Sequence, residues 1–245
     1  MAESLLCIDA GNTRVKWGVH GGRAWTATGA IETGDVATTL AAAWPKASTP
    51  KRAIASNVAG PEVRSAIERA CAGAGMTITF IGSEASQLGV TNGYRDPTQL
   101  GSDRWAAMIA AHHAVRGHKL VACAGTALTI DALAGDGKFM GGLIVAGPAL
   151  MRRSLDRGTA GLRLTEGVFQ DFPATTPDAI TSGAIQACVG AIARLREAME
   201  RRGAKPGRIV LSGGAAGEIA PHLPIEHAIH ENLVLDGLVL IAAAR

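Results

Sequence analysis

The sequence predicts an α/β protein built from two similar halves, and three observations carry this prediction. Residues 5–81 alternate between strand-like and helix-like segments in the order β-β-β-α-β-α-β, which is typical of a layered α/β unit. The opening pattern of strand, turn with glycine and threonine, and second strand returns over residues 119–132. The chain has 245 residues, 47% of them hydrophobic, which is enough to bury the core of one large domain or two small ones.

The first half begins with a predicted β-hairpin. An apolar run over residues 5–8 breaks at residues 9–13 and resumes over residues 15–19, where apolar residues alternate with Lys16 and Gly18. Residues 83–100 are predicted to form a polar loop. The other elements expected in this half are strands at Arg23–Ile31, Arg52–Asn57 and Met76–Ile81, and helices at Asp35–Trp44, Pro61–Ala74 and Ser102–Val115.

The second half repeats the opening hairpin and ends in a helix. The strands expected here are Lys119–Cys123, Ala127–Ala132, Phe139–Val145 and Arg208–Leu211, and the helices are Leu150–Asp156, Pro177–Gly203 and Asn232–Ala244. We therefore expect an N-terminal half over residues 1–115 and a C-terminal half over residues 116–245.

Composition and charge exclude several classes of protein. A net charge of +3 is too small to indicate a nucleic-acid partner, and the four cysteines include no C-x-x-C pair, which favours reduced thiols. The N-terminus has no basic region before its short apolar run, and no apolar stretch approaches the ~20 residues that span a bilayer. The seven histidines form no metal-ligand pattern. We expect a cytoplasmic protein with no nucleic-acid or membrane partner.

The turn of the first hairpin is a candidate phosphate site. Gly11 allows close approach of a ligand to the backbone or a positive φ, while Asn12 and Thr13 offer small polar groups. Lys16 adds a positive charge. Asp9, an acid at the end of an apolar strand, is explained by a Mg²⁺ ion held near phosphates. The alternative is an ordinary hairpin in which Asp9 caps its own turn.

Four stretches in a fixed order resemble the type III pantothenate kinases of the actin-like, sugar-kinase-like ATPase superfamily. They are Asp9–Lys16, Gly101–Arg104 followed by Trp105, Gly125–Ala127 with Thr129, and the glycine-rich stretch Gly141–Pro148. The resemblance implies two tandem ribonuclease-H-like (actin-like ATPase) domains, each a mixed five-stranded sheet with flanking helices. It also implies ATP-dependent phosphorylation of pantothenate to 4'-phosphopantothenate, the first step of coenzyme A synthesis.

The resemblance also implies the residues of the site. Asp103 is the candidate catalytic base, and Asp9 is the candidate ligand of Mg²⁺. The residues expected to bind ATP are Asp9, Ala10, Gly11, Asn12, Thr13, Arg14, Val15, Lys16, Thr126, Gly213 and Gly214. Those expected to bind the substrate are Tyr94, Gly101, Ser102, Asp103, Arg104 and Thr176.

Each of these assignments has a simpler alternative. Asp103 at a helix start is stabilised by the helix dipole, whether it acts as a base or only caps the helix. Arg104 can hold the carboxylate of pantothenate through two hydrogen bonds, or it is a solvated surface residue. Tyr94 contacts the substrate or seals the edge of the core, and Thr176 contacts it or caps a helix. The Gly213-Gly214 pair is also a common turn.

Cys123 departs from the family pattern. The family usually has an aspartate three residues before the threonine of the second phosphate motif, where it binds a monovalent cation, K⁺ or NH₄⁺. A neutral thiol is a poor ligand for a hard cation, so dependence on K⁺ is in doubt in this chain.

A homodimer is expected for two reasons. The helix Ser102–Val115 is apolar on more than one face, and a two-fold partner is the commonest way to bury such a surplus. The alternative is burial of this helix within its own chain. The resemblance further implies that Thr176 of one subunit reaches the substrate of the other. Two other functions compete with pantothenate kinase: a transcription accessory protein on the same scaffold, or another small-molecule kinase of the superfamily.

Overall fold

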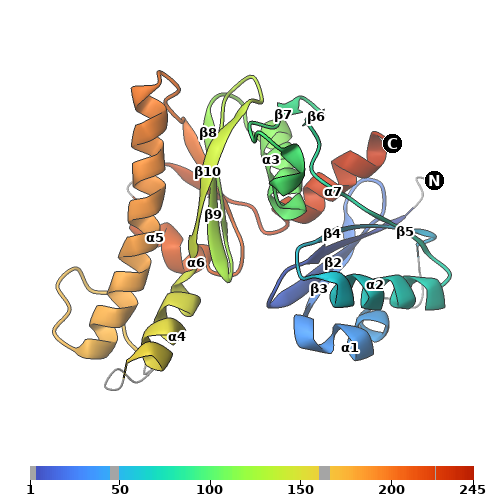
Figure 1. Ribbon diagram of the computed structural model, residues 1–245, viewed down its shortest axis with the longest axis horizontal. Coiled ribbons are helices and arrows are strands. Elements are labelled where there is room, and N and C mark those ends of the chain that lie inside the picture. The colour runs from blue at the N-terminus through green and yellow to red at the C-terminus, as the bar shows by residue number, and fades with distance from the viewer. Residues whose placement is uncertain (1–3, 45–49, 160–165, 224) are drawn as a thin grey trace. The chain divides into compact units, whose positions relative to one another are not determined.

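The computed structural model describes residues 4–44, 50–159, 166–223 and 225–245 and divides the chain into two compact units (Figure 1). Unit 1 comprises Met1–His113 together with Leu233–Arg245, and unit 2 comprises Ala114–Asn232. Residues 1–3, part of the N-terminal segment in which no secretory signal is expected, lie outside the described residues.

Unit 1 is built on a five-stranded mixed sheet with the strand order β3-β2-β1-β4-β5. Strands β1 and β2 are antiparallel, as are β2 and β3, whereas β4 runs parallel to both β1 and β5. The strands are β1 Leu5–Ala10, β2 Arg14–His20, β3 Trp25–Glu32, β4 Arg52–Asn57 and β5 Thr77–Phe80. The polar ends of β1 and β4 therefore meet at one edge of the sheet, because the carboxyl ends of parallel strands lie together.

Helices cover both faces of this sheet. Alternate residues of β1, among them Leu6 and Ile8, join one apolar core with residues of α1 (Val36–Ala43) and α2 (Pro61–Gly73). Helix α7 (Leu233–Ala243) contacts β1, β2 and β4. It also packs closely on α3 (Ser102–Ala114): a Cβ atom at Gly237 would lie 2.0 Å from the carbonyl oxygen of Ala106.

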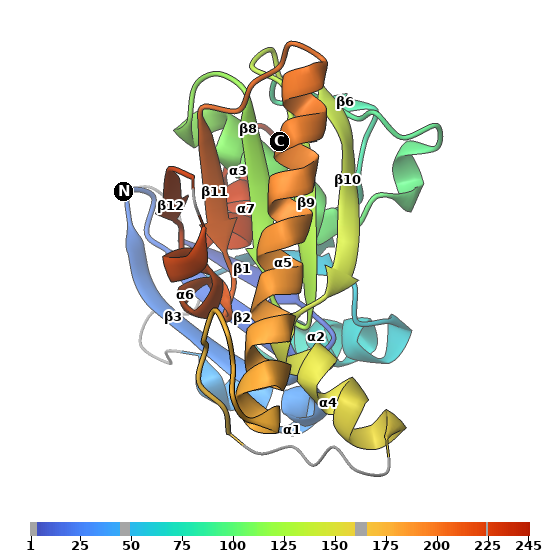
Figure 2. The same ribbon diagram turned by 90° about the vertical axis from the view of Figure 1, so that its left-hand side faces the viewer.

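Unit 2 repeats the topology of unit 1. Its sheet has the order β10-β9-β8-β11-β12, in which β8, β9 and β10 are antiparallel neighbours and β11 runs parallel to both β8 and β12. The strands are β8 Lys119–Ala124, β9 Ala127–Leu133, β10 Phe139–Ala146, β11 Arg208–Ser212 and β12 His227–Ile229. The long helix α5 (Thr176–Arg201) lies along one face of this sheet (Figure 2), where Cys188 and Ile192 pack on alternate residues of β8 and β9. Helices α4 (Pro148–Gly158) and α6 (Ala216–Ile219) lie beside it.

The predicted fold class is confirmed, since both sheets are mixed and five-stranded and both open with the same hairpin. The elements that the sequence did not predict are short. In the described parts of the chain they include the hairpin of β6 (Ser86–Gln87) and β7 (Val90–Thr91), strand β12 and helix α6. Two- to four-residue elements contain too few positions to show a hydrophobic period.

The predicted division of the chain at residue 115 does not hold for the C-terminal helix. The prediction placed it in the second half, but α7 packs on the first sheet and belongs to unit 1. Its buried side chains include Leu235 and Leu238, and the carboxylate of Asp236 accepts a hydrogen bond from the indole N–H of Trp25 on β3 at 2.9 Å. These contacts, rather than position in the sequence, decide where the helix belongs.

The structure also corrects the expectation that helix α3 has an apolar face left over for a second subunit. Its side chains from Arg104 to Ala111 are all buried within this one chain. The surplus apolar face that was expected to require a second subunit is therefore absent. None of the helices in the described parts of the chain is both long and apolar enough to cross a bilayer.

Candidate active site

The turn between β1 and β2 exposes its polar residues and buries its flanks. Asn12 and Thr13 are exposed, whereas the side chains of Ala10 and Val15 are fully buried in the core, so only their backbone can reach a ligand. Gly11 does not have a positive φ; a Cβ atom there would lie 3.3 Å from the Arg14 carbonyl oxygen, which is a tight contact. Of the two reasons suggested for a glycine at this position, close approach of the backbone is the one that the structure allows.

This turn is braced by the chain that follows β3. The Thr33 hydroxyl donates to the Gly11 carbonyl oxygen at 2.7 Å, and the Thr33 N–H donates to the Thr13 carbonyl oxygen at 2.9 Å. The guanidinium of Arg14 pairs with Glu32 at 3.2 Å, with both side chains more than half exposed. The exposed residues of the turn are therefore held by backbone contacts on their inner side.

Asp9 lies at the end of β1, opposite Lys16 on β2 and Ser56 on β4. Burial raises the pKa of its carboxyl from the usual 3.8 to about 7; the neighbouring charge of Asp103 adds to the increase and the charge of Lys16 opposes it. Two carboxyl groups, Asp9 on the sheet and Asp103 on α3, are thus close enough to interact. Such a pair favours a bound cation, which would relieve the repulsion between them.

Asp103 occupies the first turn of α3. Burial raises the pKa of its carboxyl, while the Arg104 backbone N–H, which donates to Oδ1 at 2.8 Å, and the Arg104 charge lower it. A Cβ atom at Gly101 would lie 2.5 Å from Oδ1 of Asp103, so a larger residue there would require the Asp103 side chain to move. Gly101 therefore leaves room for the conformation that Asp103 adopts.

The start of α3 is fixed to the sheet by a buried pair of hydroxyls. Ser102 Oγ lies 2.9 Å from Ser56 Oγ, and Ser56 is fully buried at the end of β4. The sequence-based prediction missed Ser56. The signal was the Ser-Asn pair that ends an otherwise apolar strand, at the sheet edge where β1 ends in Asp9.

Arg104 is buried rather than solvated at the surface, with 4% of its area exposed. Its Nη1 donates to the Tyr94 hydroxyl at 3.0 Å, and its guanidinium carbon lies 5.7 Å from the centre of the tyrosine ring. Tyr94 is placed by the Asn92 side chain, which accepts a hydrogen bond from the Tyr94 N–H at 3.0 Å. The structure therefore brings together Asp9, Ser102, Asp103, Arg104 and Tyr94 within unit 1.

In unit 2, three glycine-containing turns meet at the ends of β8, β10 and β11. The Gly147 N–H donates to the Thr126 carbonyl oxygen at 2.8 Å, and a Cβ atom at Gly147 would lie 2.1 Å from the Gly125 carbonyl oxygen. Gly213 has a φ of 97° and would place a Cβ atom 2.3 Å from the Ala124 carbonyl oxygen. At both positions only glycine fits, because a Cβ atom would overlap backbone atoms of the turn after β8, at Gly147, or of the end of β8 itself, at Gly213.

Cys123 and Thr129 stand opposite each other beside this group of turns. They pair across β8 and β9, and Cys123 is partly exposed. The Thr129 hydroxyl is buried without a hydrogen-bond partner. In the parts of the chain that the structure describes, no three histidine, cysteine or carboxylate side chains are placed to hold a metal ion by themselves.

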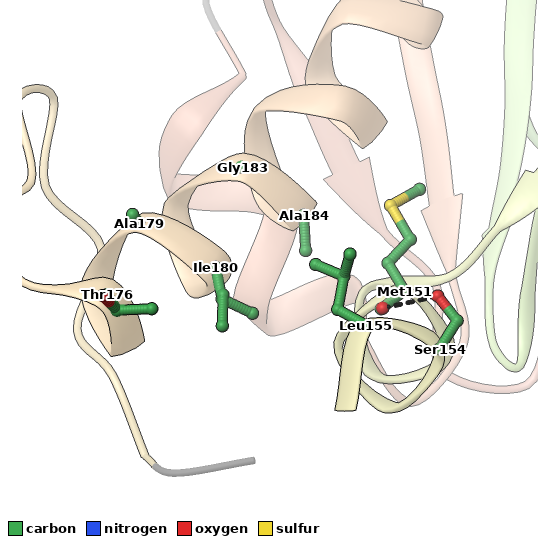
Figure 3. A pocket seen from close by; sticks show the side chains of 8 residues that line it. All are labelled: Met151, Ser154, Leu155, Thr176, Ala179, Ile180, Gly183 and Ala184. Atoms are coloured by element: carbon green, nitrogen blue, oxygen red, sulfur yellow. Dashed lines mark hydrogen bonds between the residues drawn. The ribbon is translucent and has the colours of Figure 1, made fainter. Parts of the chain in front are cut away.

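Thr176 is not the cap of its helix. The side chain that caps α5 is that of Thr175, which accepts a hydrogen bond from the Asp178 N–H at 3.3 Å. Thr176 instead lines a groove of about 540 Å³ between α4 and α5 (Figure 3). There, Met151 and Leu155 of α4 face Ile180 and Ala184 of α5, with Thr176 towards the start of α5.

Two sheets of the same topology, each opening on a hairpin with a polar turn, define the class of this protein: it has the actin-like ATPase fold. MreB5 of Spiroplasma citri, solved with bound ADP, matches 99% of this chain and 97% of its own with a TM-score of 0.55 and 9% identity. A Campylobacter jejuni protein described as a Baf family transcriptional activator matches 98% of each chain with a TM-score of 0.60 and 16% identity. At these identities the likeness shows the fold alone.

Sequence similarity then gives the family. The chain belongs to the type III pantothenate kinase family, which matches residues 5–198. The type III pantothenate kinase of Dechloromonas aromatica is 42% identical over 236 residues, covering 96% of this chain and 97% of that protein. These matches confirm the predicted family, fold class and kinase activity, and a kinase of this family uses ATP.

Proposed function

We propose that this chain transfers the γ-phosphoryl group of ATP to the terminal hydroxyl of pantothenate, giving 4'-phosphopantothenate in the first step of coenzyme A synthesis. The observation that carries this proposal is the group of side chains at the carboxyl edge of the first sheet. There, two interacting carboxyl groups, Asp9 and Asp103, accompany the buried Arg104–Tyr94 pair in a chain of the type III pantothenate kinase family.

Asp103 is the proposed catalytic base. Its carboxylate accepts the hydroxyl proton while the hydroxyl oxygen attacks the γ-phosphorus, the bond from that phosphorus to the bridging oxygen breaks, and ADP leaves. Burial raises the pKa of Asp103, which makes its carboxylate a better proton acceptor. Arg104 and Tyr94 hold the pantothenate carboxylate, for which a buried guanidinium is well suited.

The ATP phosphates are assigned to the exposed turns. The exposed turn residues Asn12 and Thr13, with Lys16, would bind phosphate oxygens, and Thr126 would contribute its hydroxyl and N–H. The Gly11 N–H already donates to the Arg14 carbonyl oxygen at 3.0 Å, so Gly11 would provide room for the phosphates rather than a donor. Gly213 and Gly214 would leave bare backbone against the nucleoside. Asp9 fits a Mg²⁺ ligand, because Mg²⁺ is usually held by one or two carboxylates together with substrate phosphates. When bound, the ion would neutralise the charge of the transferred group.

A monovalent cation fits this chain poorly. Around Cys123 the structure offers a thiol and the Thr129 hydroxyl, both neutral, where the family usually has a carboxylate. We expect replacement of Na⁺ by K⁺ at constant ionic strength to change turnover by less than about twofold, because a neutral thiol is a poor ligand for a hard cation. Cys123→Asp should create K⁺ activation and Cys123→Ser, the matched neutral variant, should not. Strong K⁺ activation of the wild-type protein would mean that other oxygens complete the site.

We still propose a homodimer. The observation that supports it is no longer an apolar face of α3 but a set of exposed apolar side chains in unit 2. Large apolar side chains are exposed there, among them Phe172 at 95%, Val168 at 67% and Ile144 at 62%. The groove that contains Thr176 lies between α4 and α5 of this unit. Large apolar side chains exposed to this extent are frequent at interaction sites, and a two-fold pairing is the commonest way to cover them.

Subunit exchange tests whether Thr176 of one subunit serves the active site of the other. Asp103→Asn and Thr176→Glu should each be nearly inactive alone, because one lacks the base and the other places a carboxylate near the substrate carboxylate. An equal mixture should regain activity in about a quarter of its sites, since half of the dimers are mixed and one of their two sites receives both intact residues. Light scattering supplies the mass. A fully active monomer, or no recovery in a mixture shown to exchange, contradicts the shared site.

The activity itself is tested by coupled ADP release. The protein should release ADP with pantothenate and ATP, and not with acetate or a panel of sugars. Turnover of a sugar instead would favour another small-molecule kinase of the superfamily. No turnover of any acceptor, in protein that still binds nucleotide, would favour the regulatory alternative.

A further inference from the structure

An ion pair in unit 2 joins two helices that the proposed reaction does not otherwise use. The guanidinium of Arg152 on α4 faces the carboxylate of Glu218 on α6, with contacts from Nη1 to Oε1 and from Nη2 to Oε2, the latter at 3.5 Å. The side chains are only 21% and 32% exposed. This bidentate arrangement fixes the relative orientation of the two side chains as well as their distance, which a contact made by a single nitrogen does not.

The surroundings of the pair make it stronger than an ordinary surface pair. The sulfur of the buried Cys188 thiol on α5 lies 3.9 Å from the Ala146 carbonyl oxygen. This thiol is close enough to interact with the charges of both Arg152 and Glu218. Burial raises the pKa of this thiol to about 11; Glu218 adds to the increase and Arg152 opposes it. Charges beside an apolar interior interact more strongly than charges surrounded by water.

Both helices start beside turns assigned above to ATP. The Met151 N–H donates to the Gly147 carbonyl oxygen in the first turn of α4, and the Gly147 N–H donates in turn to the Thr126 carbonyl oxygen at 2.8 Å. On the other side, the Ala215 N–H just before α6 donates to the Ala124 carbonyl oxygen at 3.0 Å. The backbone therefore connects Arg152 to the Thr126 turn and Glu218 to the Gly213–Gly214 turn.

We propose that Arg152 and Glu218 are positioning residues that clamp α4 to α6 and so hold the Thr126 turn and the Gly213–Gly214 turn at the spacing that the nucleotide requires. The inference rests on the proposed assignment of these turns to ATP. It specifies which step should suffer when the pair is broken: nucleotide binding, and not the binding of pantothenate. The proposed pantothenate residues are Tyr94 and Arg104 in unit 1 and Thr176 on α5, and none of them lies on the two helices that the pair joins.

The test uses both single variants and the exchanged pair. Arg152→Ala and Glu218→Ala should each weaken binding of a fluorescent ADP analogue, and raise the KM for ATP, by about tenfold, the effect of losing one well-placed charged contact. The KM for pantothenate should stay unchanged. The double variant Arg152→Glu with Glu218→Arg should regain most of the lost affinity, and Arg152→Lys should retain more than Arg152→Ala. The matched control is Arg194→Ala, because Arg194 pairs with Glu197 on the surface of α5, where the two side chains are 69% and 53% exposed.

Each alternative outcome has a distinct meaning. A lower melting temperature with unchanged affinity for the ADP analogue would show a purely structural pair and overturn the proposal, as would an equal rise in the KM values of both substrates. If the exchanged variant does not fold, the affinities of Arg152→Lys and Arg152→Ala for the ADP analogue decide. Higher affinity of Arg152→Lys supports the proposal, and equal loss of affinity in the two variants overturns it. A wild-type protein that binds the analogue but phosphorylates no acceptor would refute the proposed function while leaving the clamp testable by binding.

Discussion

Asp103→Asn is expected to lower kcat by about 10²- to 10⁴-fold, the range that a general base contributes. Asparagine has nearly the shape of aspartate but cannot accept the hydroxyl proton. Its side-chain oxygen can still accept the hydrogen bond that Oδ1 of Asp103 receives from the Arg104 N–H at 2.8 Å, so the start of α3 should keep its structure. Binding of ATP and of pantothenate, measured by calorimetry, should change little.

The control separates loss of the base from loss of a helix cap. Asp136→Asn changes a carboxylate in an exposed turn, where Oδ1 accepts a hydrogen bond from the Lys138 N–H at 3.1 Å, and it should leave kcat unchanged. If Asp103→Asn lowers the melting temperature but turns over normally, the carboxylate only stabilises the first turn of α3. If it abolishes pantothenate binding, the residue serves the substrate rather than the proton.

Much of the fold could be predicted because its strands carry a clear hydrophobic pattern. In β1 and β8 the residues that face the helices alternate with others, and each strand ends at a short polar or glycine-containing turn. The same regularity showed that the chain repeats itself, and the two sheets have the same order of strands. Strand β12 and helix α6 were not predicted, because three or four residues are too few to show a hydrophobic period.

The site was less predictable because its properties arise from contacts between distant segments. The sequence shows an acid at the end of β1, but not that burial, and then the charge of Asp103 from another element, raises its pKa. It shows Ser102 beside Asp103, but not that the Ser102 hydroxyl is engaged with Ser56 inside the protein. Likewise, Arg104 looks like any arginine in a helix, and only the fold shows that it is buried beside Tyr94.

Asp9→Asn should lower Mg²⁺-dependent turnover by about 10²-fold or more, because a metal ion stabilises a transferring phosphoryl group by several kcal/mol. Pantothenate affinity should remain near that of the wild type, since the proposed role of Asp9 is with the metal and the phosphates. Calorimetry with each ligand separates the two effects. Loss of pantothenate affinity with normal handling of Mg-ATP would contradict the assignment.

The pH dependence of folding gives a second readout, which needs no nucleotide. The pKa of Asp9 is about 7 in the folded chain, against a usual value of 3.8. Between these values the folded chain holds a proton on Asp9 that the unfolded chain has released, so this group favours the folded state at low pH and loses that effect as pH rises through about 7. Asparagine cannot titrate. Urea unfolding without Mg²⁺ should therefore show a smaller fall in the free energy of unfolding from pH 5 to pH 8 for Asp9→Asn than for the wild type. Equal pH dependence in the two proteins would mean that Asp9 is ionised throughout this range, and that burial and the charge of Asp103 do not raise its pKa.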